Sequence, residues 1–274
     1  MLDAGTGARA LGNELIKRPF SGSNLNPLSS DEQTKRDLHL FFTHYHWDHL
    51  QGFPFFGPGF VPGDNKVTIH FYGKKDARVR LSHLLAGQQQ YPNSPVVWDD
   101  MPCNKYFHEL PRLESVTARI GNAMITYQEL THPDSVFAYA IEAGGKKFVC
   151  ATDTEHKSIA DPRLVKLAKD ADILYYDAQY LPEEYAGGKK GLVTGALPKL
   201  DWGHSTYQWA VINALEAGVG TVVLGHHDPL RDDSGIEEIV SRAQGFLNVQ
   251  LLLPQNKWKH LDVVAAYEGL EQEL

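Results

Sequence analysis

The segment 44–49, which reads His-Tyr-His-Trp-Asp-His, constrains this chain more than any other stretch. Four of its six residues carry strong metal-ligand side chains: His44, His46, Asp48 and His49. The apolar run 38–42 just before it is typical of a buried strand. Residues two apart on an extended chain share a face, so the first two histidines can bind one metal ion. The aspartate and the last histidine follow a turn and can reach a second ion. The segment therefore predicts a metal site in a loop after a core strand.

Three further apolar runs end in ligand-type residues. They are 123–127 before Thr131-His132, 148–152 before Asp153, and 221–225 before His226-His227. A lone histidine is usually structural or solvated. Histidines and aspartates at the carboxyl ends of several predicted strands favour a metal site instead.

The order His-x-His-x-Asp-His, then His, Asp and His resembles the metallo-β-lactamase fold superfamily. Two strings narrow this resemblance, namely Gly-His-Ser-Thr at 203–206 and Asp-Ala-Gln-Tyr at 177–180. Together with Leu-Asp-Ala-Gly-Thr-Gly at 2–7, they resemble the ribonuclease Z and phosphodiesterase branch. The resemblance extends from Leu2 to about Pro229. Its motifs are specific indicators of the fold and of metal binding, but they are weak indicators of the substrate.

The order of predicted elements fits this resemblance, because strands come first and strand-helix alternation follows. We expect an α/β fold of four layers: an αβ/βα sandwich of two packed mixed sheets with helices outside and the metal site at one sheet edge. Residues 1–274 are expected to form a single metallo-hydrolase domain. Members of this superfamily usually carry one or two strands before the position of Leu2, so N-terminal strands are expected to be missing.

The resemblance implies two divalent metal ions. It assigns His44, His46 and His132 to the first, Asp48, His49 and His226 to the second, and Asp153 as the bridge between them. Three imidazoles with an open position suit catalytic zinc, although manganese and iron accept the same ligands. His226 and His227 both remain candidates, and the string Val-Val-Leu-Gly-His favours the former.

Asp48, Asp177 and His204 are the predicted catalytic residues. By resemblance, His204 supplies a hydrogen bond or proton to a phosphate oxygen or to the leaving group, and Asp177 orients it. A simpler hypothesis is that 203–206 merely begins a helix with its hydroxyls as caps, although a helix start also attracts anions. In ribonuclease Z the corresponding acid is glutamate, so the shorter Asp177 departs from that pattern.

The remaining polar residues receive simpler interpretations. Glu155-His156 is predicted to be polar surface, and Asp228 to form a turn before Pro229. Five histidines without ligand spacing are predicted to be core, helix-surface or solvated residues: His39, His70, His83, His108 and His260.

Local signals predict the other elements. Helices are expected over 8–18, over 76–86 with Gly87 as C-cap, after Asp161-Pro162, from Ser205 or Thr206 to Gly218, and after a capping box of Ser234 with Glu237. Strands are expected over 66–72, 125–128, 136–142, 147–152 and 173–177, with a hairpin turn at Gly144-Gly145. Loops are expected over 19–36, 50–65, 88–112 and 183–202, with the aromatic residues of 50–65 packed in the core.

Composition limits the location and the partners. No apolar run approaches the roughly 20 residues of a membrane span, and no signal-peptide pattern begins the chain, so a cytoplasmic protein without membrane contact is expected. The two cysteines, Cys103 and Cys150, make neither a disulfide framework nor a cysteine zinc site. The net charge of −8 opposes broad nucleic-acid binding but allows a small anionic substrate. A homodimer is the default assembly.

The leading functional hypothesis is a dinuclear phosphodiesterase that hydrolyses a small cyclic or linear phosphodiester through a metal-bridging hydroxide. A tRNA 3′-processing endonuclease like ribonuclease Z is disfavoured by the acidic charge and by the absence of a long basic arm. It is also disfavoured by the sequence after His226, which lacks the Phe-Ser-x-Arg-Tyr type of string. The motifs are also compatible with a lactone or thioester hydrolase of the same fold and, less readily, with a metal-stabilised binding protein.

Overall fold

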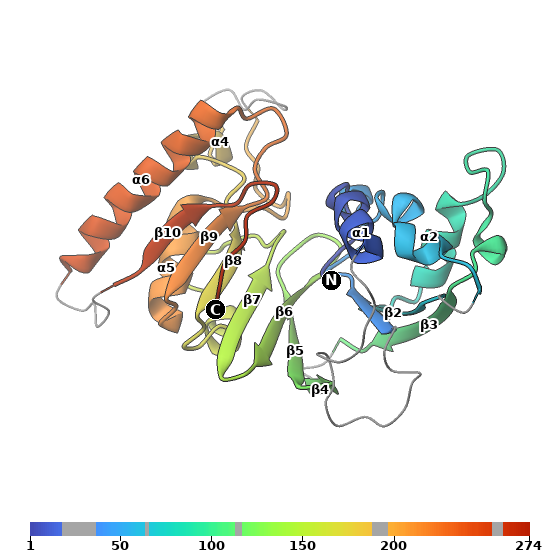
Figure 1. The fold of residues 1–274 in the computed structure, drawn as a ribbon. Helices are drawn as coiled ribbons and strands as arrows, with labels where there is room; N and C mark the ends of the chain where they lie inside the picture. The colour runs from blue at the N-terminus through green and yellow to red at the C-terminus, as the bar shows by residue number, and fades with distance from the viewer. Residues whose placement is uncertain (18–36, 64–65, 113–116, 188–196, 254–259) are drawn as a thin grey trace. The chain divides into compact units, whose positions relative to one another are not determined.

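The computed structural model describes residues 1–17, 37–63, 66–112, 117–187, 197–253 and 260–274 (Figure 1). The chain divides into an N-terminal unit, residues 1–112, and a C-terminal unit, residues 113–274. Each unit has its own sheet and hydrophobic core, so the predicted α/β fold with two sheets is confirmed. The loop predicted over 19–36 lies outside the described residues. None of the described helices combines the length and apolar character needed to cross a membrane.

Three parallel strands form the sheet of the N-terminal unit, in the order β1 (Asp37–Phe41), β2 (Thr68–Lys74) and β3 (Asn104–Leu110). The helices of this unit are α1 (Gly7–Lys17), α2 (Leu81–Gln88) and the 3-10 helices η2 (Trp47–His49), η3 (Phe53–Phe55), η4 (Gly57–Phe60) and η6 (Trp98–Asp100). Residues of α1, α2, η3, η4 and η6 pack in the core on the sheet face that carries Leu40, Ile69 and Phe71. Phe53 and Phe56 are buried in the same core, as predicted for the aromatic segment, whereas the prediction is wrong for Phe55, which is 66% exposed.

Two further predictions for this unit are wrong. The helix predicted over 76–86 begins only at Leu81 and continues through Gly87. Asp76 instead accepts a hydrogen bond from the backbone N–H of Arg78, which makes a turn. The second error is the loop predicted over 88–112, because this range contains the strand β3. Each residue of β3 is either partly or fully exposed.

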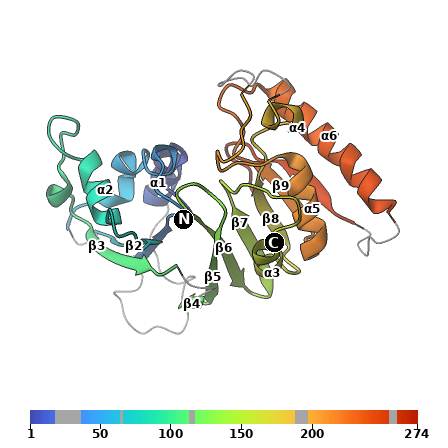
Figure 2. The same cartoon turned by 180° about the vertical axis from the view of Figure 1, so that it is seen from behind.

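The C-terminal unit contains a seven-stranded mixed sheet in the order β10-β9-β8-β7-β6-β5-β4. Its strands are β4 (Thr117–Ile120), β5 (Ala123–Leu130), β6 (Val136–Ala143), β7 (Lys146–Ala151), β8 (Ile173–Asp177), β9 (Thr221–Gly225) and β10 (Asp262–Ala265). Its helices are α3 (Pro162–Leu167), α4 (Pro182–Tyr185), α5 (Tyr207–Ala217) and α6 (Asp233–Leu251). Helices α3, α5 and α6 cover one face of the sheet (Figure 2).

Strand direction explains where the polar residues gather. Strand β6 is antiparallel to both β5 and β7, whereas β7, β8 and β9 are parallel. Strands β5, β7, β8 and β9 therefore point the same way, and their carboxyl ends share one edge of the sheet. The predicted hairpin turn between β6 and β7 is confirmed, because Gly144 and Gly145 both have a positive φ, 59° and 79°.

Helix ends in this unit confirm two predictions. Asp161 caps α3 by accepting a hydrogen bond from the N–H of Arg163, and Gly218 ends α5 with a φ of 73°.

One predicted cap is confirmed in position only, and another is wrong. At the start of α5, Thr206 is the N-cap as predicted, but its side chain makes no capping bond, and the Ser205 N–H donates to the carboxylate of Asp177. Asp232 caps α6 by accepting from the Gly235 N–H, so Ser234 lies inside the helix and no capping box with Glu237 forms.

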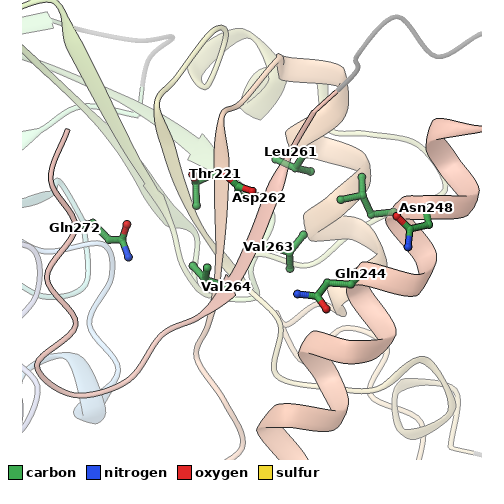
Figure 3. Close-up of a pocket in the computed structure, with 9 residues that line it drawn as sticks. Thr221, Gln244, Asn248, Leu261, Asp262, Val263, Val264 and Gln272 are labelled. Carbon is green, nitrogen blue, oxygen red and sulfur yellow. The ribbon is translucent and has the colours of Figure 1, made fainter.

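A cavity of about 440 Å³ lies between β10 and α6 (Figure 3). Polar side chains such as Gln244, Asp262 and Gln272 line it together with apolar residues such as Val263. Among the described residues that line it, none belongs to the predicted metal or catalytic set, so this cavity is separate from those residues.

Candidate functional site

The N-terminal unit holds its four predicted ligands in one tight loop after β1. The ring centroids of His44 and His46 are 4.5 Å apart, and those of His44 and His49 are 4.3 Å apart. The turn of η2 brings Asp48 back towards this group, with its carboxylate 3.1 Å from Nε2 of His49. The loop therefore gathers three imidazoles and a carboxylate within one short segment.

Asp3 orients this loop, a role that the sequence does not reveal. Its carboxylate accepts hydrogen bonds from the N–H and the Oγ1 hydroxyl of Thr43, both at 2.8 Å, and it lies 2.8 Å from Nδ1 of His49. A carboxylate that accepts from Nδ1–H directs Nε2 of the ring towards a metal. The only signal for Asp3 in the sequence is its position in the string 2–7.

Four predicted site residues of the C-terminal unit follow strands that end at one sheet edge. His132 follows β5, Asp153 follows β7, Asp177 ends β8 and His226 follows β9. The prediction that apolar strands deliver these residues to their carboxyl ends is thus confirmed by the strand directions.

Asp153 and His226 adopt unusual backbone conformations at this edge. Their φ angles are 51° and 53°, in the left-handed region that residues other than glycine rarely adopt. Nδ1 of His226 lies 3.3 Å from the Asp153 carboxylate. The N–H of His226 donates to the hydroxyl of Tyr175 at 3.0 Å, which holds this turn in place. Such strain concentrates at functional sites, where the surrounding contacts maintain it.

His204 and Asp177 form the predicted pair. The Asp177 carboxylate is fully buried, and it accepts from Nδ1 of His204 at 2.9 Å. Its other oxygen accepts the N–H groups of Gln179 and Ser205, each at 3.1 Å. The His204 ring stacks on the ring of His226 with centroids 4.9 Å apart. Aspartate is therefore long enough to orient His204, despite the glutamate expected from ribonuclease Z.

Of the two candidate ligands, His226 belongs to a cluster of ligand-type residues in the described part of the chain. His226, His204 and Asp177 each offer a ligand atom within 4.8 Å of the others. Burial and the nearby Arg231 guanidinium lower the pKa of His227. Asp228 accepts from the N–H of Leu230, so it forms the predicted turn.

The prediction that Glu155-His156 is polar surface is wrong. The side chain of Glu155 is buried, and its carboxylate accepts hydrogen bonds from the N–H groups of Asp201 and Gly203. Nδ1 of His156 lies 3.0 Å from the hydroxyl of Ser205, and burial lowers the pKa of this histidine to about 4. Both residues therefore hold the loop that carries His204.

The donor sets of both units fit divalent transition metals. Imidazole nitrogens and carboxylate oxygens are ligands that zinc, manganese and iron accept. One support is of the kind seen around metal ligands, because the Asp3 carboxylate accepts from Nδ1 of His49 at 2.8 Å.

The sequence of this chain is similar to those of known proteins. Residues 1–227 match the family described as the Beta-lactamase superfamily domain. Ribonuclease Z of Brevibacillus brevis is 29% identical over 148 residues, which cover 53% of this chain and 39% of that protein. The chain thus matches well under half the length of this curated relative.

Solved structures show the same fold. The metallo-beta-lactamase fold protein YhfI from Bacillus subtilis has a TM-score of 0.60 and 16% identity, and the match covers 98% of this chain and 84% of that one. Human tRNase Z, short form, has a TM-score of 0.59 and 17% identity, with 98% and 85% covered. The match to the family over residues 1–227 shows that this chain belongs to the beta-lactamase superfamily, the hydrolase family with the metallo-β-lactamase fold.

Proposed function

We propose that this protein is a dinuclear metal-dependent phosphodiesterase that acts on a small cyclic or linear phosphodiester. The observation that carries the proposal is the hydrogen-bonded pair of Asp177 and His204, which lies at the same sheet edge as Asp153 and His226. A buried carboxylate that orients an imidazole is suited to proton transfer.

The proposed ligand sets follow the order of the motifs along the chain. His44, His46 and His132 would hold one ion, Asp48, His49 and His226 the other, and Asp153 would bridge them. Zinc is the proposed metal, because the set is rich in imidazole. Two bound ions would lower the pKa of a shared water towards neutrality and so supply the hydroxide nucleophile.

The protein's own groups account for the remaining steps. The Nδ1–H of His204 donates to Asp177, and when Nε2 is protonated as well, the imidazolium can pass that Nε2 proton to the leaving-group oxygen and become the neutral ring. Burial raises the pKa of Tyr180 to about 12, so its phenol stays protonated at neutral pH and can donate a hydrogen bond. Its ring lies 6.1 Å from the ring of His204. Both groups would contact an anionic phosphoryl group more favourably than a neutral ester.

The test compares turnover of bis-p-nitrophenyl phosphate with turnover of a simple lactone and a simple thioester by the zinc-loaded protein. We expect the phosphodiester to be the preferred substrate. Turnover of only the thioester or only the lactone would contradict the phosphodiesterase assignment while leaving a metal-dependent hydrolase in place.

The second candidate is cleavage of precursor tRNA at its 3′ end. The 29% identity with ribonuclease Z over 148 residues favours it, whereas the net charge of −8 weighs against a long polyanionic substrate. Incubation with a precursor tRNA separates the two. A defined 3′ cleavage at a rate above that of the small diester would establish the endonuclease.

A further inference from the structure

The loop 201–206, which carries His204, has a backbone shape that needs outside support. Asp201 and Gly203 both have a positive φ, 64° and 90°. The backbone at Gly203 also lies against the ring of His132, since a Cβ there would come 2.2 Å from Cδ2 of that ring. A non-glycine residue could not occupy this position without moving one or the other. The loop thus combines strain at Asp201 with close packing at Gly203, and the buried N–H of Gly203 requires an acceptor.

Glu155 supplies the acceptors. Oε1 accepts the Asp201 N–H at 2.7 Å and the hydroxyl of Tyr185 at 2.5 Å, and Oε2 accepts the Gly203 N–H at 3.1 Å. The residue is only 7% exposed. Hydrogen bonds from N–H and O–H groups to a buried carboxylate are stronger than those between neutral groups, so this residue holds the loop firmly.

The same short segment is tied to two other parts of the site. The N–H of Glu155 donates to the carbonyl of Thr131, the residue just before His132, at 2.8 Å. Asp153 lies two residues earlier in the chain. Glu155 therefore connects three parts of the predicted site. They are the turn that carries Asp153, the residue before His132 and the loop that carries His204. All of these groups belong to the C-terminal unit.

We propose that Glu155 is a positioning residue that sets the orientation of His204, an inference that rests on the proposed function for its catalytic consequence. Replacing Glu155 by glutamine turns one carboxylate oxygen into an NH₂ group. That group would face an N–H or O–H donor, so at least one of the three hydrogen bonds is lost and two donors oppose each other. The loop would relax, and the contact between His204 and Asp177 would change.

The experiment compares the zinc-loaded wild type with Glu155→Gln, His204→Ala and the double variant. We expect Glu155→Gln to lower kcat on bis-p-nitrophenyl phosphate by about 10- to 100-fold, with KM and metal content nearly unchanged, because misplacement by about 1 Å can cost 100-fold. In the His204→Ala background the same substitution should change kcat by less than about twofold, since the two residues act as one unit. A full additional loss in that background would overturn the proposal.

A second readout does not depend on activity. The ring signal of His204 in a ¹H–¹³C NMR spectrum, assigned by its disappearance in His204→Ala, should shift in Glu155→Gln. It should stay in place in the matched control Glu183→Gln, which removes a carboxylate that pairs with Arg242. An unchanged signal in Glu155→Gln would refute the positioning role.

Two further outcomes remain distinguishable. If Glu155→Gln does not fold, Tyr185→Phe removes one of the three hydrogen bonds while the loop N–H groups keep theirs. A shifted His204 signal in that variant supports the proposal, and an unshifted one overturns it. If the wild type is inactive on every phosphodiester, the proposed function fails, but the NMR shift still decides the role of Glu155.

Discussion

Replacement of Asp177 by asparagine tests the proposed proton-transfer pair most sharply. Asparagine keeps one carbonyl oxygen, which can still accept the N–H groups of Gln179 and Ser205. Its NH₂ group would then face Nδ1 of His204, where the carboxylate now accepts at 2.9 Å. The ring would have to place its proton on Nε2 and accept at Nδ1, so it would lose its charged partner.

The expected magnitude follows from the loss of one charge-assisted hydrogen bond at a fully buried group. Such a bond contributes about 1.5–3 kcal/mol. At about 1.4 kcal/mol per tenfold change, kcat should fall by about 10- to 150-fold. The deficit should be larger for a diester with an alkoxide leaving group than for one with p-nitrophenolate, because a more basic leaving group needs more help from an acid.

The assay measures kcat for both kinds of diester with zinc-loaded protein at neutral pH. Asp172→Asn is a matched control, because Asp172 precedes the other end of β8 and its carboxylate accepts the N–H of Lys147. It should leave kcat unchanged. Equal kcat for Asp177→Asn and wild type on both substrates would refute the reasoning.

Three further predictions concern supports of the site and pH. Asp3→Asn should weaken metal retention about 10- to 100-fold by loosening His49, as measured by titration with a chelator; unchanged retention would contradict this. Tyr175→Phe should lower the free energy of unfolding by about 1–3 kcal/mol, because the His226 N–H loses its acceptor; urea unfolding measures this, and equal midpoints would argue against it. Burial lowers the pKa of His39 from 6.5 to about 4, so the unfolded chain binds more protons between these pH values. The free energy of unfolding should therefore fall as pH decreases through that window, by on the order of 1–2 kcal/mol for this half-buried ring, and His39→Phe should flatten the decrease. An equal pH dependence of the free energy of unfolding in wild type and His39→Phe would exclude His39 as its cause.

Much of the C-terminal site could be predicted because its information is local. Apolar runs such as 221–225 show where a strand ends, and the next polar residue then lies at the sheet edge. The parallel direction of β7, β8 and β9 brings Asp153, Asp177 and His226 to one edge without further information.

The supporting residues could not be predicted, because their partners are distant in the chain. Glu155 accepts hydrogen bonds from backbone N–H groups 46 and 48 residues away. Every residue except proline has such a group, so the sequence does not indicate which of them will be the partner. Asp3 lies 46 residues from His49. These contacts exist only once the chain has folded.

The errors in secondary structure have a similar cause. Strand β3 carries polar and charged side chains such as Lys105 and Glu109 among its aromatic residues, and most of the strand is exposed, so no clear apolar alternation marks it. The predicted start of α2 at Asp76 is too early, because the carboxylate of Asp76 closes a turn with Arg78 and the helix begins only at Leu81.

Metal content measured by elemental analysis on the same samples used for phosphodiester turnover tests the central claim most directly. We expect about two divalent ions per chain in wild type and in His204→Ala, with turnover of bis-p-nitrophenyl phosphate only in the wild type. Wild-type protein that binds no metal under saturating zinc, or His204→Ala that turns over at the wild-type rate with two ions bound, would contradict it.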